Sequence, residues 1–402
     1  MANAAAPSER TLLQESDLTF AGMFFLPESF GGGGFDATAG RGLAFRYVDG
    51  ALRVFSTVYR IDVGFDIFEA VVPESLGMTF NTAPSATLLR NWGFPSPVVS
   101  GINNLYWDSV DSLLYFTGGD TYIDNGTFMC FGRVPLNDGN GTFGTSMVWR
   151  LDGRSSKFCM HGITPVPQWF QDANCPGMRL ALGFGGYESE VAAGPASLGH
   201  AVTAFNPEQL GSSGSALSSA YWKSLVGFPY NPNPYTAPTR QHRDNNYNTQ
   251  MANFPYWNPQ GATGYWAEQD YIQGGGCWVD TLTKSGFVGA AVMGNGDLRY
   301  VSSDLEAQST THARVIYAPA NFALVAQGGV GESEIQPSSY TLVEYPDITY
   351  PMAGWRALPE QLITGSWFDA ETSLYYVSVK HPQGNIHPTP NPQVVYAYQV
   401  AA

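Results

Sequence analysis

The chain has 402 residues and a formal net charge of −15, and only 13% of its residues are Asp, Glu, Lys or Arg, against roughly 25% in an average soluble protein. This acidic excess repels phosphate backbones and anionic lipid surfaces, so we expect no nucleic-acid partner. No apolar run approaches the roughly 20 residues that span a bilayer, and the first residues lack the basic and apolar regions of a signal peptide, so we expect no membrane insertion.

The composition favours an all-β fold. The chain contains 45 Gly and 27 Pro, and 14% of its residues are aromatic. These turn formers are scattered between short runs of Val, Leu, Phe, Tyr and Trp, which is typical of many short strands joined by hairpins. Long amphipathic helices need charged faces, and few could be built from this composition.

One pattern recurs along the chain. A first strand is predicted over 18–27, and five copies of a two-strand unit follow, starting at Gly42, Gly101, Gly162, Gly276 and Gly365. Each copy reads as two apolar strands joined by a tight turn. The copies 101–116 and 365–377 align without a gap from the aromatic-Asp pair onward, Trp107-Asp108 and Phe368-Asp369.

A further strand follows each copy and generally ends at or near a proline, which fits the outermost strand of a sheet because proline cannot donate to a strand ladder. These strands are predicted over 67–73, 128–135, 200–207, 340–346 and 394–400. An inner hairpin, a variable loop, an outer strand and a linker are the parts of a propeller blade. We therefore predict one β-propeller domain over 1–402 with about five blades, six being the alternative, and with strand 18–27 pairing into the last blade to close the ring.

The segment 208–268 interrupts the repeat. It is rich in Pro, Asn and aromatic residues, and it is predicted as a long insertion between blades 3 and 4, or as a degenerate sixth blade. Flat aromatic faces beside amides suit sugar rings and protein interfaces alike. The ligand-binding candidates are Tyr221, Trp222, Tyr230, Tyr235, Tyr256, Trp257, Tyr265 and Trp266. Packing of the insertion over the propeller flank remains the alternative.

The two ends of the chain resemble a set of uncharacterised bacterial and phage-associated β-propeller proteins. The resemblance rests on SDLTFAGMFFLP (16–27), GLAF (42–45), THARVIYAP (311–319), ITGSWFDAETSLYYVSVKH (363–381) and PQVVYAYQV (392–400). These motifs are structural, so the resemblance implies a propeller and carries no catalytic residue across.

Three residues are candidates for the central channel. His161 directly precedes the third inner strand, and Glu188 and Glu190 follow the third hairpin. Propeller glycosidases place a pair of carboxylates in the channel mouth, but nothing in the sequence supplies these two with a partner. By contrast, Asp108, Asp280 and Asp369 occupy equivalent places after an inner strand, where an Asp side chain caps the turn.

No cofactor or metal is predicted, because the histidines form no metal-binding motif. The four cysteines have no zinc-type spacing and read as buried thiols, with Cys159–Cys175 as the one pairing that a local hairpin could bring into disulfide range.

Two functions are consistent with these features. The main hypothesis is a non-enzymatic binding or assembly module, on a virion or another extracellular surface, that contacts a protein partner or a surface glycan; a homo-oligomer is a further option. The alternative is a carbohydrate-active enzyme, similar to a glycoside hydrolase, with carboxylates in the channel mouth.

Overall fold

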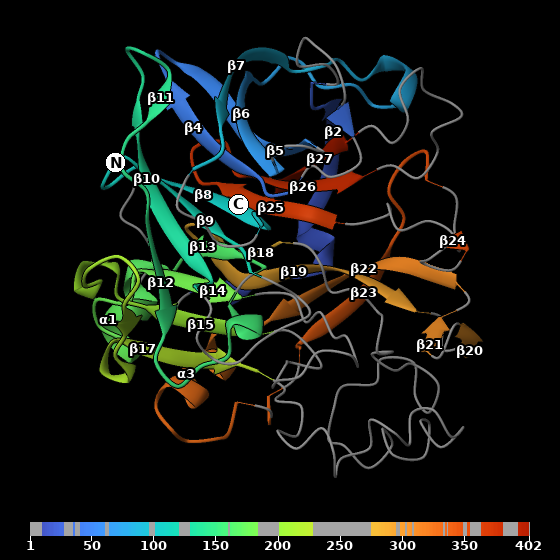
Figure 1. Cartoon of the computed structure of the whole chain (residues 1–402). Coiled ribbons are helices and arrows are strands. Elements are labelled where there is room, and N and C mark those ends of the chain that lie inside the picture. The colour runs from blue at the N-terminus through green and yellow to red at the C-terminus, as the bar shows by residue number, and fades with distance from the viewer. Residues whose placement is uncertain are drawn as a thin grey trace.

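Short apolar strands form five sheets of four antiparallel strands, arranged around one axis as the blades of a β-propeller (Figure 1). The predicted fold class is confirmed. The structure is a computed structural model, and the residues that it describes are 10–27, 35–36, 41–60, 64–95, 101–119, 129–159, 161–183, 201–227, 275–294, 298–301, 304–307, 309–332, 334–335, 337–348, 352–353, 363–380 and 393–401.

Blades 1 to 3 follow one another in chain order, each from its inner to its outer strand. Blade 1 contains β4 (Ala44–Val48), β5 (Ala51–Arg60), β6 (Gly64–Val71) and β7 (Thr87–Gly93). Blade 2 contains β8 (Asn104–Asp108), β9 (Leu113–Thr117), β10 (Phe131–Asn137) and β12 (Met147–Leu151). Blade 3 contains β13 (Ile163–Pro165), β14 (Leu180–Gly183), β15 (Val202–Phe205) and β17 (Trp222–Val226).

Blades 4 and 5 complete the ring. Blade 4 contains β18 (Gly276–Asp280), β19 (Lys284–Gly294), β22 (Ser309–Tyr317) and β23 (Ser339–Val343). Blade 5 contains β25 (Ile363–Asp369), β26 (Leu374–Lys380) and β27 (Gln393–Val400), and its fourth strand is β2 (Leu18–Phe25) from the start of the chain. The predicted closure of the ring is confirmed, because β2 pairs antiparallel with β27 from Leu18–Val400 to Phe25–Val394.

Shorter elements extend these blades. The two-residue strands are β1 (Thr11–Leu12) on β19, β3 (Phe35–Asp36) on β5, β11 (Thr142–Phe143) on β10, β16 (Ala216–Leu217) on β12 and β24 (Met352–Ala353) on β22, and β20 (Leu298–Val301) pairs with β21 (Asp304–Ala307). The helices are α1 (Gln168–Asn174) and α3 (Pro319–Ala326), with 3₁₀ turns at Glu15–Asp17, Phe80–Thr82, Ser156–Phe158, Pro207–Gln209 and Ser219–Tyr221.

The hydrophobic core lies between neighbouring blades, because the inner strands of each blade bury side chains on both faces of their sheet. Phe55 and Leu105 belong to the cluster between blades 1 and 2, and Phe131 and Leu180 to the cluster between blades 2 and 3. Further clusters fill the three remaining interfaces and close the ring. This two-sided burial explains why strands such as β26 are almost continuously apolar rather than alternating.

Glycines at the start of the inner strands let the blades approach one another at the axis. A Cβ on Gly42 would lie 2.9 Å from the backbone nitrogen of Leu105 in blade 2, and a Cβ on Gly365 would lie 2.7 Å from the Cβ of Leu43 in blade 1. A Cβ on Gly275 would lie 2.1 Å from the nitrogen of Ser366. Only glycine fits at these contacts, which explains the glycines that start the first and the fifth copies of the repeat, Gly42 and Gly365.

Three details differ from the sequence-based predictions. The strand predicted to be outermost is the third strand in blades 1, 2, 3 and 5, and only 340–346 contributes an outermost strand, β23. The third copy of the repeat is not a tight hairpin, because α1 stands between β13 and β14. Residues 216–226, which we placed in the insertion, form β16 and β17 of blades 2 and 3, while 228–274 lie outside the described residues.

Candidate functional site

Polar groups gather at the end of the axis where the inner strands begin. We call this set the axial polar cluster; its members, drawn from blades 1, 2, 3 and 5, are Arg41, Thr57, Asn103, Asn104, His161, Thr364, Ser378 and Gln393. Most of these side chains are buried, and Asn104 and Ser378 are at most 2% exposed. Buried polar groups need partners, so the contacts within the cluster fix its geometry.

Blades 1 and 2 meet through Arg41. Its Nη1 donates to Oδ1 of Asn103 at 2.6 Å, and its guanidinium lies 5.7 Å from the centroid of the Phe65 ring. The backbone of Arg41 is held by Thr57, whose hydroxyl donates to the Arg41 carbonyl and accepts from the Arg41 N–H, both at 2.8 Å. The segment that leads into β4 therefore holds the guanidinium of Arg41 in place at the axis.

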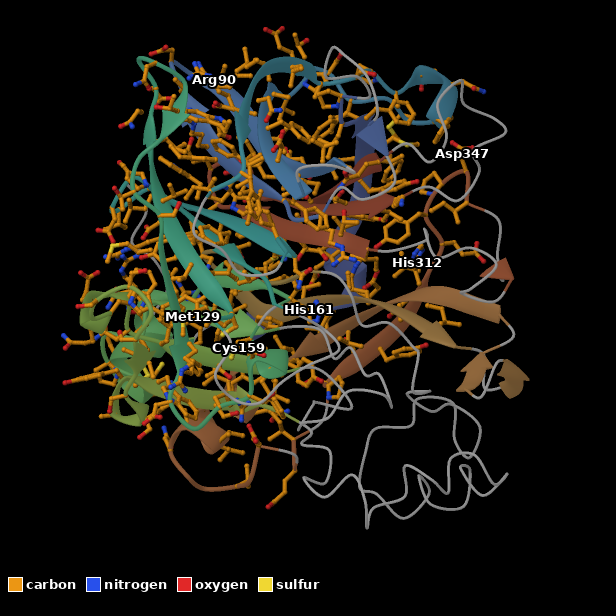
Figure 2. All side chains as sticks on the ribbon, viewed as in Figure 1. Arg90, Met129, Cys159, His161, His312 and Asp347 are labelled. Carbon is orange, nitrogen blue, oxygen red and sulfur yellow. The ribbon has the colours of Figure 1, made fainter. Side chains whose placement is uncertain are left out.

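Blades 2 and 3 meet through Asn104, the first residue of β8. Its Nδ2 donates to the carbonyl oxygen of His161 at 3.2 Å, and its Oδ1 accepts from the Leu105 N–H at 2.7 Å. His161 is 4% exposed and stands two residues before β13. Figure 2 shows it near the middle of the molecule, with Cys159 close by. The backbone of His161 therefore lies at the axial end, and a channel role for its side chain stays a prediction.

Blade 5 contributes hydroxyl and amide groups. The Thr364 hydroxyl lies 2.9 Å from the hydroxyl of Ser378, and Nε2 of Gln393 donates to the two oxygens at 2.7 and 2.8 Å. The carbonyl of Thr364 accepts from the Gly42 N–H at 2.6 Å, which joins blade 5 to blade 1. Guanidinium, amide and hydroxyl groups therefore lie around one end of one axis.

Of the other predicted site residues, the structure describes Tyr221 and Trp222, and it does not bring these two into the cluster. Glu188 and Glu190 lie outside the described residues, as do Tyr230, Tyr235, Tyr256, Trp257, Tyr265 and Trp266. Tyr221 is 40% exposed at the end of a 3₁₀ turn, and Trp222 begins β17, the outer strand of blade 3. The Trp222 ring packs against the guanidinium of Arg154 at 5.9 Å. These two aromatic residues thus form part of a blade, and a ligand-binding role for the set stays a prediction.

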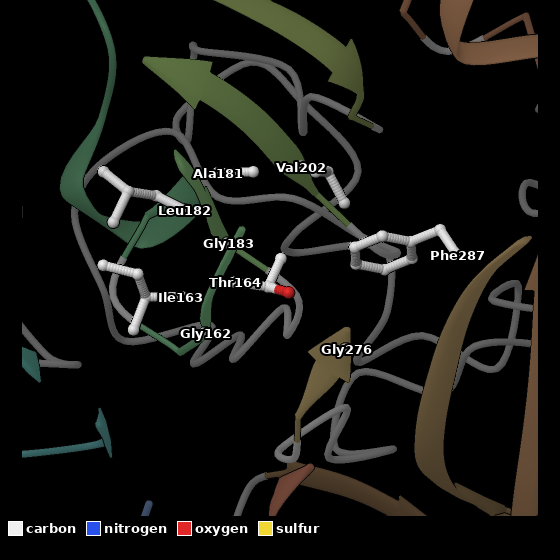
Figure 3. Close-up of a pocket in the computed structure, with 9 residues that line it drawn as sticks. All are labelled: Gly162, Ile163, Thr164, Ala181, Leu182, Gly183, Val202, Gly276 and Phe287. Atoms are coloured by element: carbon white, nitrogen blue, oxygen red, sulfur yellow. The ribbon is translucent and has the colours of Figure 1, made fainter. Parts of the chain in front are cut away.

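A small hollow adjoins the cluster between blades 3 and 4 (Figure 3). Its empty space of about 140 Å³ is partly open to solvent, and the hollow is too narrow to hold a water molecule. Thr164 carries the only polar side chain among its lining residues, which are Gly162, Ile163, Thr164, Ala181, Leu182, Gly183, Val202, Gly276 and Phe287. The Thr164 hydroxyl already accepts from the Trp278 N–H at 3.3 Å. The hollow is a packing gap rather than a ligand site.

The opposite end of the axis holds structural carboxylates. Oδ1 of Asp108 accepts from the Val110 N–H at 3.1 Å, and Oδ1 of Asp369 accepts from the Glu371 N–H at 3.0 Å, as the repeat predicted. Asp280 differs, because its carboxylate accepts from Nε1 of Trp169 at 3.1 Å. Burial raises the pKa of Asp280 above its ordinary value.

In the described ranges we find neither a reactive thiol nor a group of metal ligands. The four cysteines are buried and free, and burial raises the pKa of the Cys175 and Cys277 thiols to about 12, which keeps both protonated at neutral pH. Across the same ranges no three His, Cys, Asp or Glu side chains group as metal ligands. No helix in this part of the chain is long and apolar enough to cross a membrane.

The chain is similar to several solved structures, whereas no protein-family model and no curated protein matches it. One is a putative glycoside hydrolase from Parabacteroides distasonis, with 8% identity, a TM-score of 0.43, and coverage of 96% of this chain and 93% of that one. Another is the catalytic domain of a GH62 α-L-arabinofuranosidase from Coprinopsis cinerea, with 8% identity, a TM-score of 0.39, and coverage of 96% and 99%.

A third similar structure comes from work on the GH130 family of mannoside phosphorylases, which contains glycoside hydrolases that target β-1,2 mannosidic linkages in Candida mannan. It shares 8% identity, a TM-score of 0.44 and 96% coverage of both chains. These findings contradict the main sequence-based hypothesis of a non-enzymatic binding or assembly module, because the neighbours are glycoside hydrolases and favour the alternative. At such identities and TM-scores the likeness carries no argument about residues, so the chemistry has to be argued from this chain.

Proposed function

We propose that the protein is a carbohydrate-active enzyme that cleaves a glycosidic bond at the axial polar cluster. The observation that supports this proposal is the convergence of a guanidinium, the amides of Asn103 and Asn104 and the hydroxyls of blade 5 at one end of the axis. A few polar groups converging from different elements are typical of small-molecule sites, where they fix the orientation of the ligand. Sugar hydroxyls both donate and accept hydrogen bonds, so they suit such a mixed set of groups.

The cleavage itself needs two carboxyl groups. One protonates the oxygen of the leaving group, while the other attacks the anomeric carbon or activates a water molecule. Strand β14 ends at Gly183, whose N–H donates to the Gly162 carbonyl at 3.0 Å, directly beside the start of the inner strand of blade 3. Glu188 and Glu190 follow in the sequence, so we propose them as this pair.

The test is hydrolysis of p-nitrophenyl α-L-arabinofuranoside, β-D-xyloside and β-D-mannoside by the purified protein. We expect release of nitrophenol from at least one glycoside, and a decrease in kcat of at least about 100-fold for both Glu188→Gln and Glu190→Gln. Glu208→Gln is the matched control, because Glu208 is 61% exposed and pairs with Arg179 outside the cluster. Folded protein that cleaves none of the three glycosides, or Gln variants as active as the parent, would contradict the proposal.

A further inference from the structure

Asn103 is held in one orientation by its neighbour. Oδ1 of Asn103 accepts from Nη1 of Arg41 at 2.6 Å. A guanidinium has only donors, so it must face the amide oxygen, and the NH₂ group of Asn103 then points the other way. The residue is 7% exposed and immediately precedes β8, whose first residue, Asn104, hydrogen-bonds to blade 3.

The two adjacent amides of this cluster are used differently. Asn104 engages both ends of its amide, with Leu105 and with the carbonyl of His161. Nδ2 of Asn103 is buried, and the part of the chain that the structure describes offers it no acceptor. Leaving a buried donor without an acceptor costs free energy, and such groups in native proteins are explained by strain, by a catalytic role, or by a bound water or ion. A ligand oxygen would supply the missing acceptor.

We propose that Asn103 is a specificity-determining residue, which donates a hydrogen bond from Nδ2 to a hydroxyl or ring oxygen of the bound sugar. Arg41 is a positioning residue that fixes the direction of this amide. The inference rests on the proposed function, because it names a contact within the same site. A polar site built to bond one substrate oxygen discriminates strongly against ligands that lack it.

The test compares two substitutions of Asn103 with a charge-matched control, using the glycoside that the parent protein cleaves. Asn103→Asp keeps an oxygen toward Arg41 and replaces the donor NH₂ by an acceptor. We expect kcat/KM to fall about 10- to 100-fold in Asn103→Asp and in Asn103→Ala, with the thermal midpoint of Asn103→Asp no lower than that of the parent. Gln399→Glu adds the same charge at the exposed end of β27, where its amide contacts Thr372 and Ser373, and should leave kcat/KM unchanged.

Arg41 is tested by rescue. Arg41→Met removes the donor that orients the amide, while Arg41→Lys restores one, so Lys should recover most of the kcat/KM that Met loses. If Asn103→Asp cleaves the glycoside with a kcat/KM within about twofold of the parent, the amide does not bind substrate and the inference is overturned, although the proposed function stands. If the parent cleaves no glycoside, the proposed function is overturned, and the inference that rests on it is overturned as well.

Discussion

At the scale of single residues, the hairpin turns show how far local chemistry specifies the structure. Asp108 and Asp369 cap equivalent turns, and Ser112 and Ser373 occupy the same place four residues later with the same φ of 56°. This left-handed conformation favours glycine over residues with a Cβ. The two copies that align without a gap in the sequence therefore also share their backbone strain.

We expect Ser373→Gly to raise the free energy of unfolding by about 0.5–1 kcal/mol, because glycine removes the left-handed penalty while losing some unfolded-state entropy. The check is urea denaturation followed by tryptophan fluorescence. Ser373→Ala is the control, since it keeps the Cβ and should bring no gain. A glycine variant less stable than the parent would show that the serine hydroxyl matters more than the strain.

The pair of Asp17 and Lys284 leads to a prediction about pH. Burial alone would raise the pKa of Asp17, but hydrogen bonds from Lys284 and from the Gln14 N–H, together with the charge of Lys284, lower it below its ordinary value of 3.8. A lowered pKa stabilises the folded state above pH 3.8, and this contribution is lost as the pH falls through the folded value.

We therefore expect Asp17→Asn to be less stable than the parent at pH 7 and to approach it as the pH falls below about 4. Thermal unfolding of both proteins between pH 7 and pH 3 measures this convergence. A difference that stays constant across the range would mean that the carboxylate charge of Asp17 does not contribute. Lys284→Met should behave in the same way, because it removes the other partner.

The residues of the candidate site were only partly predictable. His161 was predicted as a channel residue because it directly precedes an inner strand, and the inner strands surround the axis. Arg41 and Asn103 were missed, because neither belongs to a catalytic motif. The sequence did contain a signal for Arg41 and Asn103, because both residues stand just before an inner strand, as His161 does.

At the scale of elements, strands buried on both faces were easy to predict and half-exposed ones were not. The inner hairpins are strongly apolar, whereas β7 has only one buried residue, Trp92, in its seven positions. A fourth strand of this kind packs on one side only, so its composition resembles that of a loop. Helix α1 was missed for a related reason, because seven residues after a proline-rich stretch carry almost no periodic signal.

Lys223 links the ends of helices α1 and α3, beside a hydrogen bond from Gln327 to the Asn174 side chain. Nζ of Lys223 on β17 donates to the carbonyl of Asn174 at the end of α1, at 3.1 Å, and to the carbonyl of Ala326 at the end of α3, at 2.9 Å. A cation at a helix C-terminus interacts favourably with the helix dipole and with the unpaired carbonyls there. Lys223 acts at two such ends and joins blade 3 to blade 4.

We expect Lys223→Met to lower the free energy of unfolding by about 1–2 kcal/mol, because both carbonyls lose a charged donor while the aliphatic part of the side chain is kept. Lys223→Arg retains donors and should lose less. Chemical denaturation of the two variants gives the comparison. Equal stability of Lys223→Met and the parent would mean that water satisfies these carbonyls equally well.

At the scale of the whole molecule, the number of blades and the closure of the ring followed from the sequence, because a repeat with an extra strand before its first copy leaves few other topologies. The N-terminal segment joins two blades, since β1 pairs with β19 of blade 4 and β2 with β27 of blade 5. Met23 and Phe25 also bridge to Gly77 and Ser85 of blade 1. The outer edge of the last blade is therefore covered.

The pairing that closes the ring depends on a glycine at position 22. Its φ is +133°, and a Cβ placed there would lie 2.6 Å from the Cβ of Leu76. We expect Gly22→Val to cost about 3 kcal/mol of stability, because strain and a steric clash act together. Native-state hydrogen exchange should show the amides of β2 and β27 losing protection together. Thr19→Val, at an exposed position of the same strand, is the control and should leave protection intact.

The closure of the ring also means that β2 stays unpaired for much of the time that the chain is being synthesised. Leu18 pairs with Val400, so β2 cannot pair along its whole length until residue 400 has been made. At about 5–20 residues per second, translation between these two points takes roughly 20–75 s. Throughout this interval β2 carries Met23, Phe24 and Phe25, which are all buried in the finished ring, without the sheet that buries them. Nascent chains should therefore be most prone to aggregation and most dependent on chaperones just before the last blade is synthesised.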